Sequence, residues 1–311
     1  MLQTKISCGI FTFFGSCGIL NKRAARANDK TEENKMKDVK FSCAGEPIVI
    51  GVLKESNADD TIKTVAQCEA EGANAFDLHI SLLEGENRGR ASLERIFAEA
   101  KSPILAVHYN NLPKGVEKKN TDAERIAEMT AAVEYGAAGI DMQGYTFCKS
   151  PLATLEGKDP KKYPFITASP REVVLDDEVI EKQKRAIEEV HKRGGEVLMS
   201  CHTKVFLDTE QIVSLALEME KRGPDIVKLV TPVNTKEEVL VALKSVMELK
   251  ANLKNAKFQY HCSGRLGRIT RYIAPYFGAS IVFATDHYNE RADKEQLLIS
   301  KFYEFYNEIK I

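Results

Sequence analysis

The chain has 311 residues and a formal net charge of −1, with 43% hydrophobic and 29% charged residues. These values are ordinary for a globular protein, and the lack of a large basic block excludes the electrostatic footprint of a nucleic-acid-binding protein. The seven cysteines are scattered, with no CxxC pair and no metal-ligand spacing, which argues against a disulfide framework and against a zinc ribbon. Length alone is compatible with one large α/β domain or with two smaller ones.

The first 45 residues differ from the rest of the chain. An apolar stretch from Ile6 to Leu20, short for a membrane-spanning helix, precedes Ala25-Arg-Ala27, which has the A-x-A form of a signal-peptidase site. The basic residues follow this stretch, whereas a secretory signal carries them in front, and a polar tract comes after them. We expect a leader or signal-like segment with a linker over 1–45. Export or membrane tethering through residues 1–27 and a cytoplasmic location both stay open.

From residue 46 onward, strand-like and helix-like segments alternate. The strands are short aliphatic runs, and the helices are amphipathic segments that begin at capping residues. The predicted strands cover 48–53, 75–83, 104–108, 138–142, 196–200, 225–230, 257–260 and 280–283. The first four predicted helices cover 60–71, 93–100, 122–135 and 178–193. Of the remaining four, one begins after Asp208, one begins after Asn234, one lies around Arg271 and one runs from Asp293 to the end.

This alternation over 46–311 predicts a single-domain α/β fold, the (β/α)8 or TIM barrel. A doubly wound sheet is the alternative, but no G-x-G-x-x-G follows the first strand, so no dinucleotide cofactor is expected. A long connection over about 143–175 interrupts the rhythm after the fourth strand. It is too short to bury a core of its own, and it leaves from a strand end, so we expect it to form a lid or a wall of the pocket.

Two reactive side chains fall on consecutive predicted strands. Lys228 lies in the run Asp225-Ile-Val-Lys-Leu-Val230, and burying an ammonium in such a strand is costly and favours loss of its proton. His202 ends the preceding strand and is suited to proton transfer near neutral pH. Either residue alone is more simply a snorkelling lysine or a structural histidine. Together they indicate Schiff-base chemistry, because a neutral amine at the mouth of a barrel attacks carbonyl carbon.

Most of the histidines follow predicted strands. Five of the six do so, namely His79, His108, His202, His261 and His287. Active sites of (β/α)8 barrels gather at the carboxyl ends of the strands, so this distribution predicts a polar pocket there. The same distribution could serve a metal ion, but no H-x-H or H-x-x-x-H spacing places two imidazoles on one element. No metal ligand is therefore assigned.

Three segments resemble the type I 3-dehydroquinate dehydratases, TIM-barrel enzymes that work through a lysine imine. They are Val197-Leu-Met-Ser-Cys-His202, Asp225-Ile-Val-Lys228 and Gly267-Arg-Ile-Thr-Arg271 followed by Pro275-Tyr-Phe-Gly-Ala-Ser280. The resemblance implies that His202 is the general acid/base, that Lys228 forms the imine and that Arg271 binds the substrate carboxylate. It runs from about Glu46 to the C terminus and is strongest from Glu196 to Phe283.

Other positions depart from the family's pattern. His79 and Ser81 occupy the positions of a glutamate and an arginine in the family's second strand, and Tyr109 occupies the position of an arginine at the end of the third. Asn289-Glu-Arg291 occupies the position of a closing Pro-Gly-Gln loop. Thr203 replaces an aspartate after His202, and Gln143 replaces the glutamate that supports the histidine, unless Asp141 or a residue of the long connection substitutes. The expected substrate-binding residues are Arg271, Gln143, His79, Tyr109, Arg291 and His261. We interpret the chain as a divergent relative with a changed substrate shell.

The resemblance implies a hydro-lyase. Lys228 would form a protonated imine with a ketone, and His202 would remove a proton from the adjacent carbon and protonate the departing hydroxyl. The expected substrate is 3-dehydroquinate or a related hydroxy-keto acid, in aromatic amino acid biosynthesis or quinate/shikimate metabolism. The expected binding partner is thus a small-molecule carboxylate, and the sequence leaves open whether the protein is a homodimer. Two alternatives remain: a catalytically degenerate barrel that binds small anions, and a metal-dependent hydrolase built on the strand-end histidines.

Overall fold

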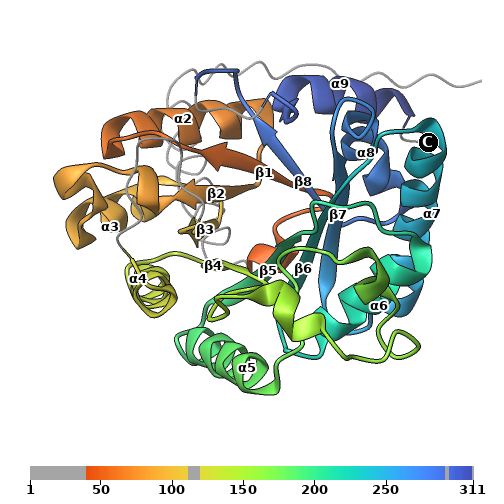
Figure 1. Ribbon diagram of the computed structural model, residues 1–311. Coiled ribbons are helices and arrows are strands. Elements are labelled where there is room, and N and C mark those ends of the chain that lie inside the picture. The colour runs from red at the N-terminus through yellow and green to blue at the C-terminus, as the bar shows by residue number, and fades with distance from the viewer. Residues whose placement is uncertain (1–39, 111–119, 291–293, 310–311) are drawn as a thin grey trace, which may run out of the picture. The chain divides into compact units, whose positions relative to one another are not determined.

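A parallel sheet curled into a barrel and covered by helices forms the core of the protein (Figure 1). The computed structural model describes residues 40–110, 120–290 and 294–309. The strands are β1 (Ile48–Leu53), β2 (Ala75–His79), β3 (Ile104–Val107), β4 (Gly139–Gln143), β5 (Glu196–His202), β6 (Ile226–Pro232), β7 (Lys257–Ser263), β8 (Ile281–Thr285) and β9 (Leu297–Leu298). The predicted α/β barrel, with eight parallel strands in chain order, is confirmed.

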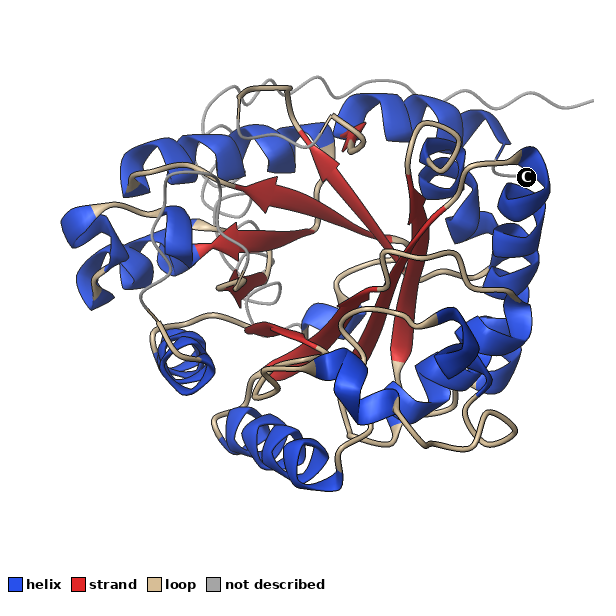
Figure 2. Ribbon diagram, viewed as in Figure 1, coloured by secondary structure: helices blue, strands red, loops and turns tan. Residues whose placement is uncertain are grey.

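The helices alternate with the strands and form the outer layer (Figure 2). They are α2 (Ala58–Glu71), α3 (Arg90–Glu99), α4 (Asp122–Glu134), α5 (Asp177–Lys192), α6 (Thr209–Glu220), α7 (Lys236–Asn252), α8 (Arg268–Ile273) and α9 (Ile299–Ile309). Side-chain caps fix where several begin, since Thr121, Asp208 and Thr235 each complete a capping box. None of the helices that the structure describes is long and apolar enough to cross a membrane.

Two strand limits differ from prediction in ways that affect the pocket. The second strand ends at His79 and is followed by a 3-10 helix, Ile80–Leu82, so Ser81 lies beyond the strand. Strands β5 and β6 extend to His202 and Pro232, two residues past the predicted limits. His202 is therefore the last residue of its strand, whereas Lys228 lies in the middle of β6, deeper in the barrel.

The barrel has one irregular junction, between β7 and β8. Neighbouring strands from β1 to β7 form parallel ladders, and β8 pairs with β1. No ladder joins β7 to β8 in the part of the chain that the structure describes, although Ser280 N donates to Phe258 O at 2.9 Å. The two strands point apart beyond that contact (Figure 2), and the short β9 pairs with the free edge of β8.

Residues that precede β1 fill the end of the barrel at which the strands begin. Phe41, in the 3-10 helix Phe41–Cys43, is fully buried among interior residues such as Ile48 and Ile281. Ser42 N donates to the Glu196 carboxylate at 2.9 Å. The barrel thus includes residues before the expected boundary at 45/46, and the expected leader lies largely in residues 1–39, outside the described residues.

The connection between β4 and α5 is irregular, with two 3-10 helices, Pro151–Leu155 and Pro164–Ala168. Its apolar side chains, Phe165 among them, pack into the main core rather than a separate one. The buried Arg222 guanidinium donates to Gly144 O at 3.3 Å and to Val174 O at 2.7 Å, which ties the two ends of the connection together. The connection is thus part of the outer barrel, and none of its described residues lines the cavity at the strand ends, so the expected lid or pocket wall is not observed.

Candidate functional site

A cavity of about 750 Å³ opens at the carboxyl ends of the strands. Of the eight residues predicted for the site, six line it: Lys228, His202, Arg271, His79, Tyr109 and His261. Its other charged or acidic lining residues are Lys54, Asp77, Lys204, Glu290 and Glu295. The strand register explains this convergence. Ser200 of β5 pairs with Lys228 of β6, and His202 lies two residues after Ser200, on the same face of β5.

Lys228 is buried and has an ionic partner. Its Nζ donates to Asp141 Oδ2 at 3.1 Å and to the Tyr109 hydroxyl at 3.0 Å, and lies 4.0 Å from the centre of the Phe283 ring. The Tyr109 hydroxyl and the Ser200 hydroxyl also donate to the Asp141 carboxylate, which is inaccessible to solvent. Sequence reasoning expected apolar surroundings for this amine, whereas the structure places a carboxylate against it.

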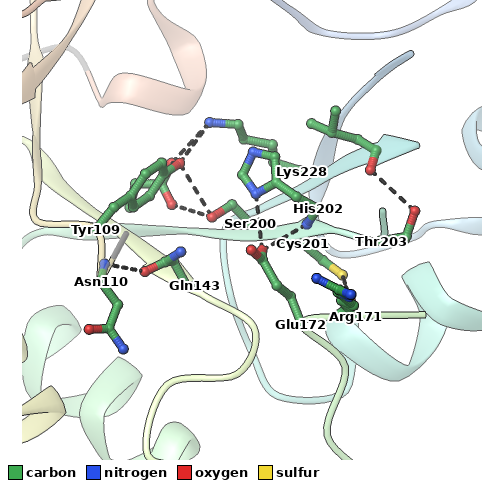
Figure 3. A network of polar contacts seen from close by, with 12 residues as sticks. Tyr109, Asn110, Gln143, Arg171, Glu172, Ser200, Cys201, His202, Thr203 and Lys228 are labelled. Atoms are coloured by element: carbon green, nitrogen blue, oxygen red, sulfur yellow. Dashed lines mark hydrogen bonds and ion pairs between the residues drawn. The ribbon is translucent and has the colours of Figure 1, made fainter. Parts of the chain in front are cut away.

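His202 is held by the connection between β4 and α5. Glu172 Oε2 accepts a hydrogen bond from His202 N at 2.9 Å and lies 3.0 Å from His202 Nδ1. The edge of the Tyr109 ring contacts the His202 ring, with 6.0 Å between centroids, and Tyr109 makes a similar contact with His79. Tyr109 therefore contacts both His202 and Lys228 (Figure 3), and it also donates to Asp141, the carboxylate partner of the lysine.

Burial sets the charge of three other groups in the cavity. It raises the pKa of Asp77 to about 7, assisted by the nearby Asp141 carboxylate. It lowers the pKa of His79 to about 3, and the ammonium groups of Lys54 and Lys228 act in the same direction. Burial and the Arg271 guanidinium hold the pKa of His261 well below its usual value. At neutral pH these two histidines are uncharged hydrogen-bonding groups.

Arg271 comes from α8 and is nearly buried in the cavity wall. One of its terminal nitrogens lies 3.9 Å from the Glu295 carboxylate, which also accepts from Gly264 N at 2.9 Å. A carboxylate can therefore sit beside this guanidinium, which suits it to anchor an acidic ligand.

Two predicted site residues are not placed in the cavity. Gln143 is the buried last residue of β4, and its side-chain oxygen accepts from Asn110 N at 2.8 Å, so this amide is used by the connection that follows β3. Its assignment to the substrate-binding set is therefore not supported. Arg291 lies outside the described residues.

The strand-end histidines divide into two groups. His79, His202 and His261 line the cavity, whereas His108 Nδ1 contacts the Glu128 carboxylate at 2.6 Å and His287 contacts Asp286. Among the described residues, no group of three or more His, Cys, Asp or Glu side chains is arranged to hold a metal ion.

Sequence reasoning missed Asp77 and Glu172. Asp77 had a usable signal, since it lies two residues before His79 on one strand and so shares its face. Glu172 lies in irregular backbone with a positive φ of 62°, and nothing in its local sequence indicates that it reaches His202.

Fold and cavity together define a (β/α)8-barrel protein in which a buried amine and an imidazole line one polar cavity. Residues 166–311 match the family model for type I 3-dehydroquinase. The 3-dehydroquinate dehydratase of Alkaliphilus oremlandii (strain OhILAs) is 33% identical over 98 residues, which are 30% of this chain and 38% of that protein. The enzyme of the same name from Clostridium kluyveri is 32% identical over 109 residues, 34% of this chain and 42% of that one. The chain thus spans about two fifths of the curated relatives it matches.

Solved structures extend the likeness in fold. Type I 3-dehydroquinate dehydratase from Clostridium difficile, with covalent modified comenic acid, has a TM-score of 0.67 at 17% identity, covering 88% of this chain and 96% of that one. 3-Dehydroquinate dehydratase from Geobacillus kaustophilus has a TM-score of 0.67 at 16% identity, covering 88% and 97%. The resemblance expected from the sequence is confirmed: the chain is similar to the type I 3-dehydroquinate dehydratases, in sequence over its C-terminal half and in fold over most of its length.

Proposed function

We propose that this barrel is a hydro-lyase that dehydrates 3-dehydroquinate, or a closely related hydroxy-keto acid, through an imine on Lys228. The observation that carries the proposal is the presence of the Lys228 amine, the His202 imidazole and the Arg271 guanidinium in the lining of one cavity. The relatives named 3-dehydroquinate dehydratase support the same substrate class. The activity belongs to aromatic amino acid biosynthesis or to quinate/shikimate metabolism.

Imine formation begins at Lys228. The amine must be free of its extra proton to attack, and Asp141 Oδ2 at 3.1 Å and the Tyr109 hydroxyl at 3.0 Å provide short routes for that proton. The nitrogen attacks the ketone carbon, and the carbonyl oxygen leaves as water. The resulting protonated imine withdraws electrons from the neighbouring carbon and makes its proton acidic.

His202 then acts on that carbon. It removes the proton, and the electron pair of the C–H bond moves into an enamine. When the imine re-forms, the hydroxyl on the next carbon departs with a proton from the imidazole, so one molecule of water is lost. Hydrolysis of the imine releases the unsaturated ketone and restores the Lys228 amine.

The remaining lining groups suit a small polyhydroxy acid. Arg271 can hold a carboxylate through two parallel hydrogen bonds, a geometry that lysine cannot reproduce. The imidazole of His79, kept neutral by its lowered pKa, can donate to or accept from substrate hydroxyl groups. The neutral ring of His261, whose Nδ1 contacts Gln259 Nε2, can donate to a hydroxyl group through Nε2. A cavity of about 750 Å³ lies in the usual range for small-molecule sites.

Borohydride trapping tests the proposal. The protein is incubated with 3-dehydroquinate and sodium borohydride, the modified residue is located by mass spectrometry, and turnover is followed by the absorbance of the conjugated ketone. We expect a reduced adduct on Lys228 and its loss, together with turnover, in Lys228→Ala. The matched control is Lys257→Ala, which removes a lysine from the opposite end of the adjacent strand β7 and should leave both intact.

Two results would overturn the proposal. Turnover near the wild-type level in Lys228→Ala would eliminate the imine mechanism. Wild-type protein that neither turns over 3-dehydroquinate nor forms an adduct with it or with related hydroxy-keto acids would eliminate the lyase function and favour a barrel that only binds anions.

A further inference from the structure

We infer that Glu172 is the carboxylate that positions His202 for proton transfer, and that the connection between β4 and α5 supplies it in place of strand β4. The kinetic part of this inference rests on the proposed function, whereas its structural part, the state of the His202 ring, does not.

The contact between the two residues fixes the imidazole. Glu172 Oε2 accepts from His202 N at 2.9 Å and lies 3.0 Å from Nδ1, so one carboxylate oxygen holds both the backbone and the ring of the histidine. An ionised carboxylate only accepts hydrogen bonds, so Nδ1 must carry a proton. In the neutral ring Nε2 is then left as the base, and the ring stands between Glu172 and the Lys228 side of the cavity (Figure 3). A carboxylate in this position selects the tautomer and stabilises the imidazolium that proton abstraction creates.

The backbone around Glu172 is fastened to the end of β5. Arg171 N donates to Thr203 O at 2.8 Å, and the Cys201 thiol contacts Arg171 O at 3.6 Å. Gly144 allows this approach, because a Cβ there would lie only 2.8 Å from Glu172 O. The segment that carries Glu172 therefore runs alongside the strand that carries His202.

A buried clamp keeps the connection in this place. Arg222 donates to Gln183 Oε1 at 2.6 Å and to Val174 O at 2.7 Å, and Gln183 Nε2 donates to Gly144 O at 3.0 Å. These bonds join the two ends of the connection to α5 and to the residues after α6. Glu172 is thus held by the fold, which is what a positioning residue requires.

The other candidates for this role are occupied elsewhere. The Asp141 carboxylate accepts from Lys228, Tyr109 and Ser200, and Gln143 carries an amide that accepts from Asn110 N. Within the described residues, Glu172 is the carboxylate that forms an ion-pair contact with His202. The histidine is therefore supported from the connection after β4 and not from the strand itself.

The experiment compares Glu172→Gln, which is nearly isosteric and removes the charge, with Glu172→Ala, which removes the acceptor. Glu156→Gln, an exposed glutamate in the same connection, is the matched control. Three quantities are measured on the full chain: the protonated nitrogen of His202 by ¹⁵N NMR of labelled protein, kcat and KM for 3-dehydroquinate, and the borohydride adduct at Lys228. Circular dichroism confirms that each variant is folded.

We expect the neutral His202 ring to carry its proton on Nδ1 in the wild type and to shift toward the Nε2-protonated form in Glu172→Ala. Glu172→Gln should lower kcat about 10²- to 10³-fold with little change in KM, and it should still form the Lys228 adduct. Formate should restore part of kcat to Glu172→Ala. The Glu156→Gln control should match the wild type in all three measurements.

The outcomes separate the inference from the proposed function. An unchanged His202 tautomer in Glu172→Ala, or kcat within twofold of wild type in Glu172→Gln, overturns the inference while wild-type turnover upholds the lyase. Loss of the adduct in Glu172→Gln also overturns it, because Glu172 would then maintain the cavity rather than the histidine. If the His202 tautomer shifts in Glu172→Ala but the wild-type protein shows no turnover, the positioning contact is upheld and the lyase function is refuted.

Discussion

The ion pair between Lys228 and Asp141 should be strongly coupled to the stability of the barrel. Both side chains are almost completely buried and their charged atoms are 3.1 Å apart. At that distance and an effective dielectric constant of about 20, two unit charges attract by about 5 kcal/mol. Desolvation of both groups offsets part of this attraction, but removing one partner leaves the other charge buried and unpaired, which typically costs about 3–5 kcal/mol.

A double-mutant cycle measures this coupling. Lys228→Met and Asp141→Asn should each lower the free energy of unfolding by about 3–5 kcal/mol, and the double variant should lose at least about 2 kcal/mol less than the sum of the two. The free energies come from urea denaturation followed by circular dichroism, at a pH where both groups are charged in the unfolded chain. Additive effects within about 0.5 kcal/mol would show that the two groups do not interact as charges in the folded protein.

Two further predictions concern single residues. Because burial raises the pKa of Asp77 to about 7, the folded protein keeps a proton that the unfolded chain releases near pH 4, so the free energy of unfolding should fall as pH rises from about 4 to about 7. In Asp77→Asn, urea denaturation across this range should show a smaller fall. An equal fall in the variant and the wild type would refute the raised pKa of Asp77. Phe41→Ala should cost about 3–5 kcal/mol because it empties a fully buried site, whereas Phe277→Ala, at an exposed ring, should change thermal stability little; similar losses in both variants would contradict this packing.

The sequence predicted those parts of the site that regular structure positions. Strands alternate their side chains with a period of two, and the carboxyl ends of parallel strands meet at one face, so the convergence of Lys228, His202 and His79 follows from strand assignment alone. Asp77 lies on the same face of β2 and was within reach of the same reasoning.

The remaining parts depend on three-dimensional contacts that no local pattern encodes. Glu172 lies in irregular backbone that is held in place by Gln183 of α5 and by Arg222, which follows α6 much later in the sequence. Gln143 occupies the predicted strand end, but its side chain accepts from Asn110 N and does not line the cavity. The pairing of Lys228 with Asp141 joins strands that are not neighbours in the sheet, so neither strand pattern reveals it.

The junction between β7 and β8 separates the cavity groups that lie on fully paired strands from Arg271, which does not. Seven junctions of the barrel are ladders, and the amine of Lys228 and the ring of His202 both lie on strands bounded by ladders on each side. Arg271 belongs to α8, which connects β7 and β8, the two strands that no ladder joins among the described residues. We expect a change in width at this junction to alter the distance from the guanidinium to the amine more than the distance from the amine to the imidazole. Under the proposed function, we therefore expect acids of different length to be accommodated on the side of the cavity that carries Arg271, while Lys228 and His202 keep their spacing.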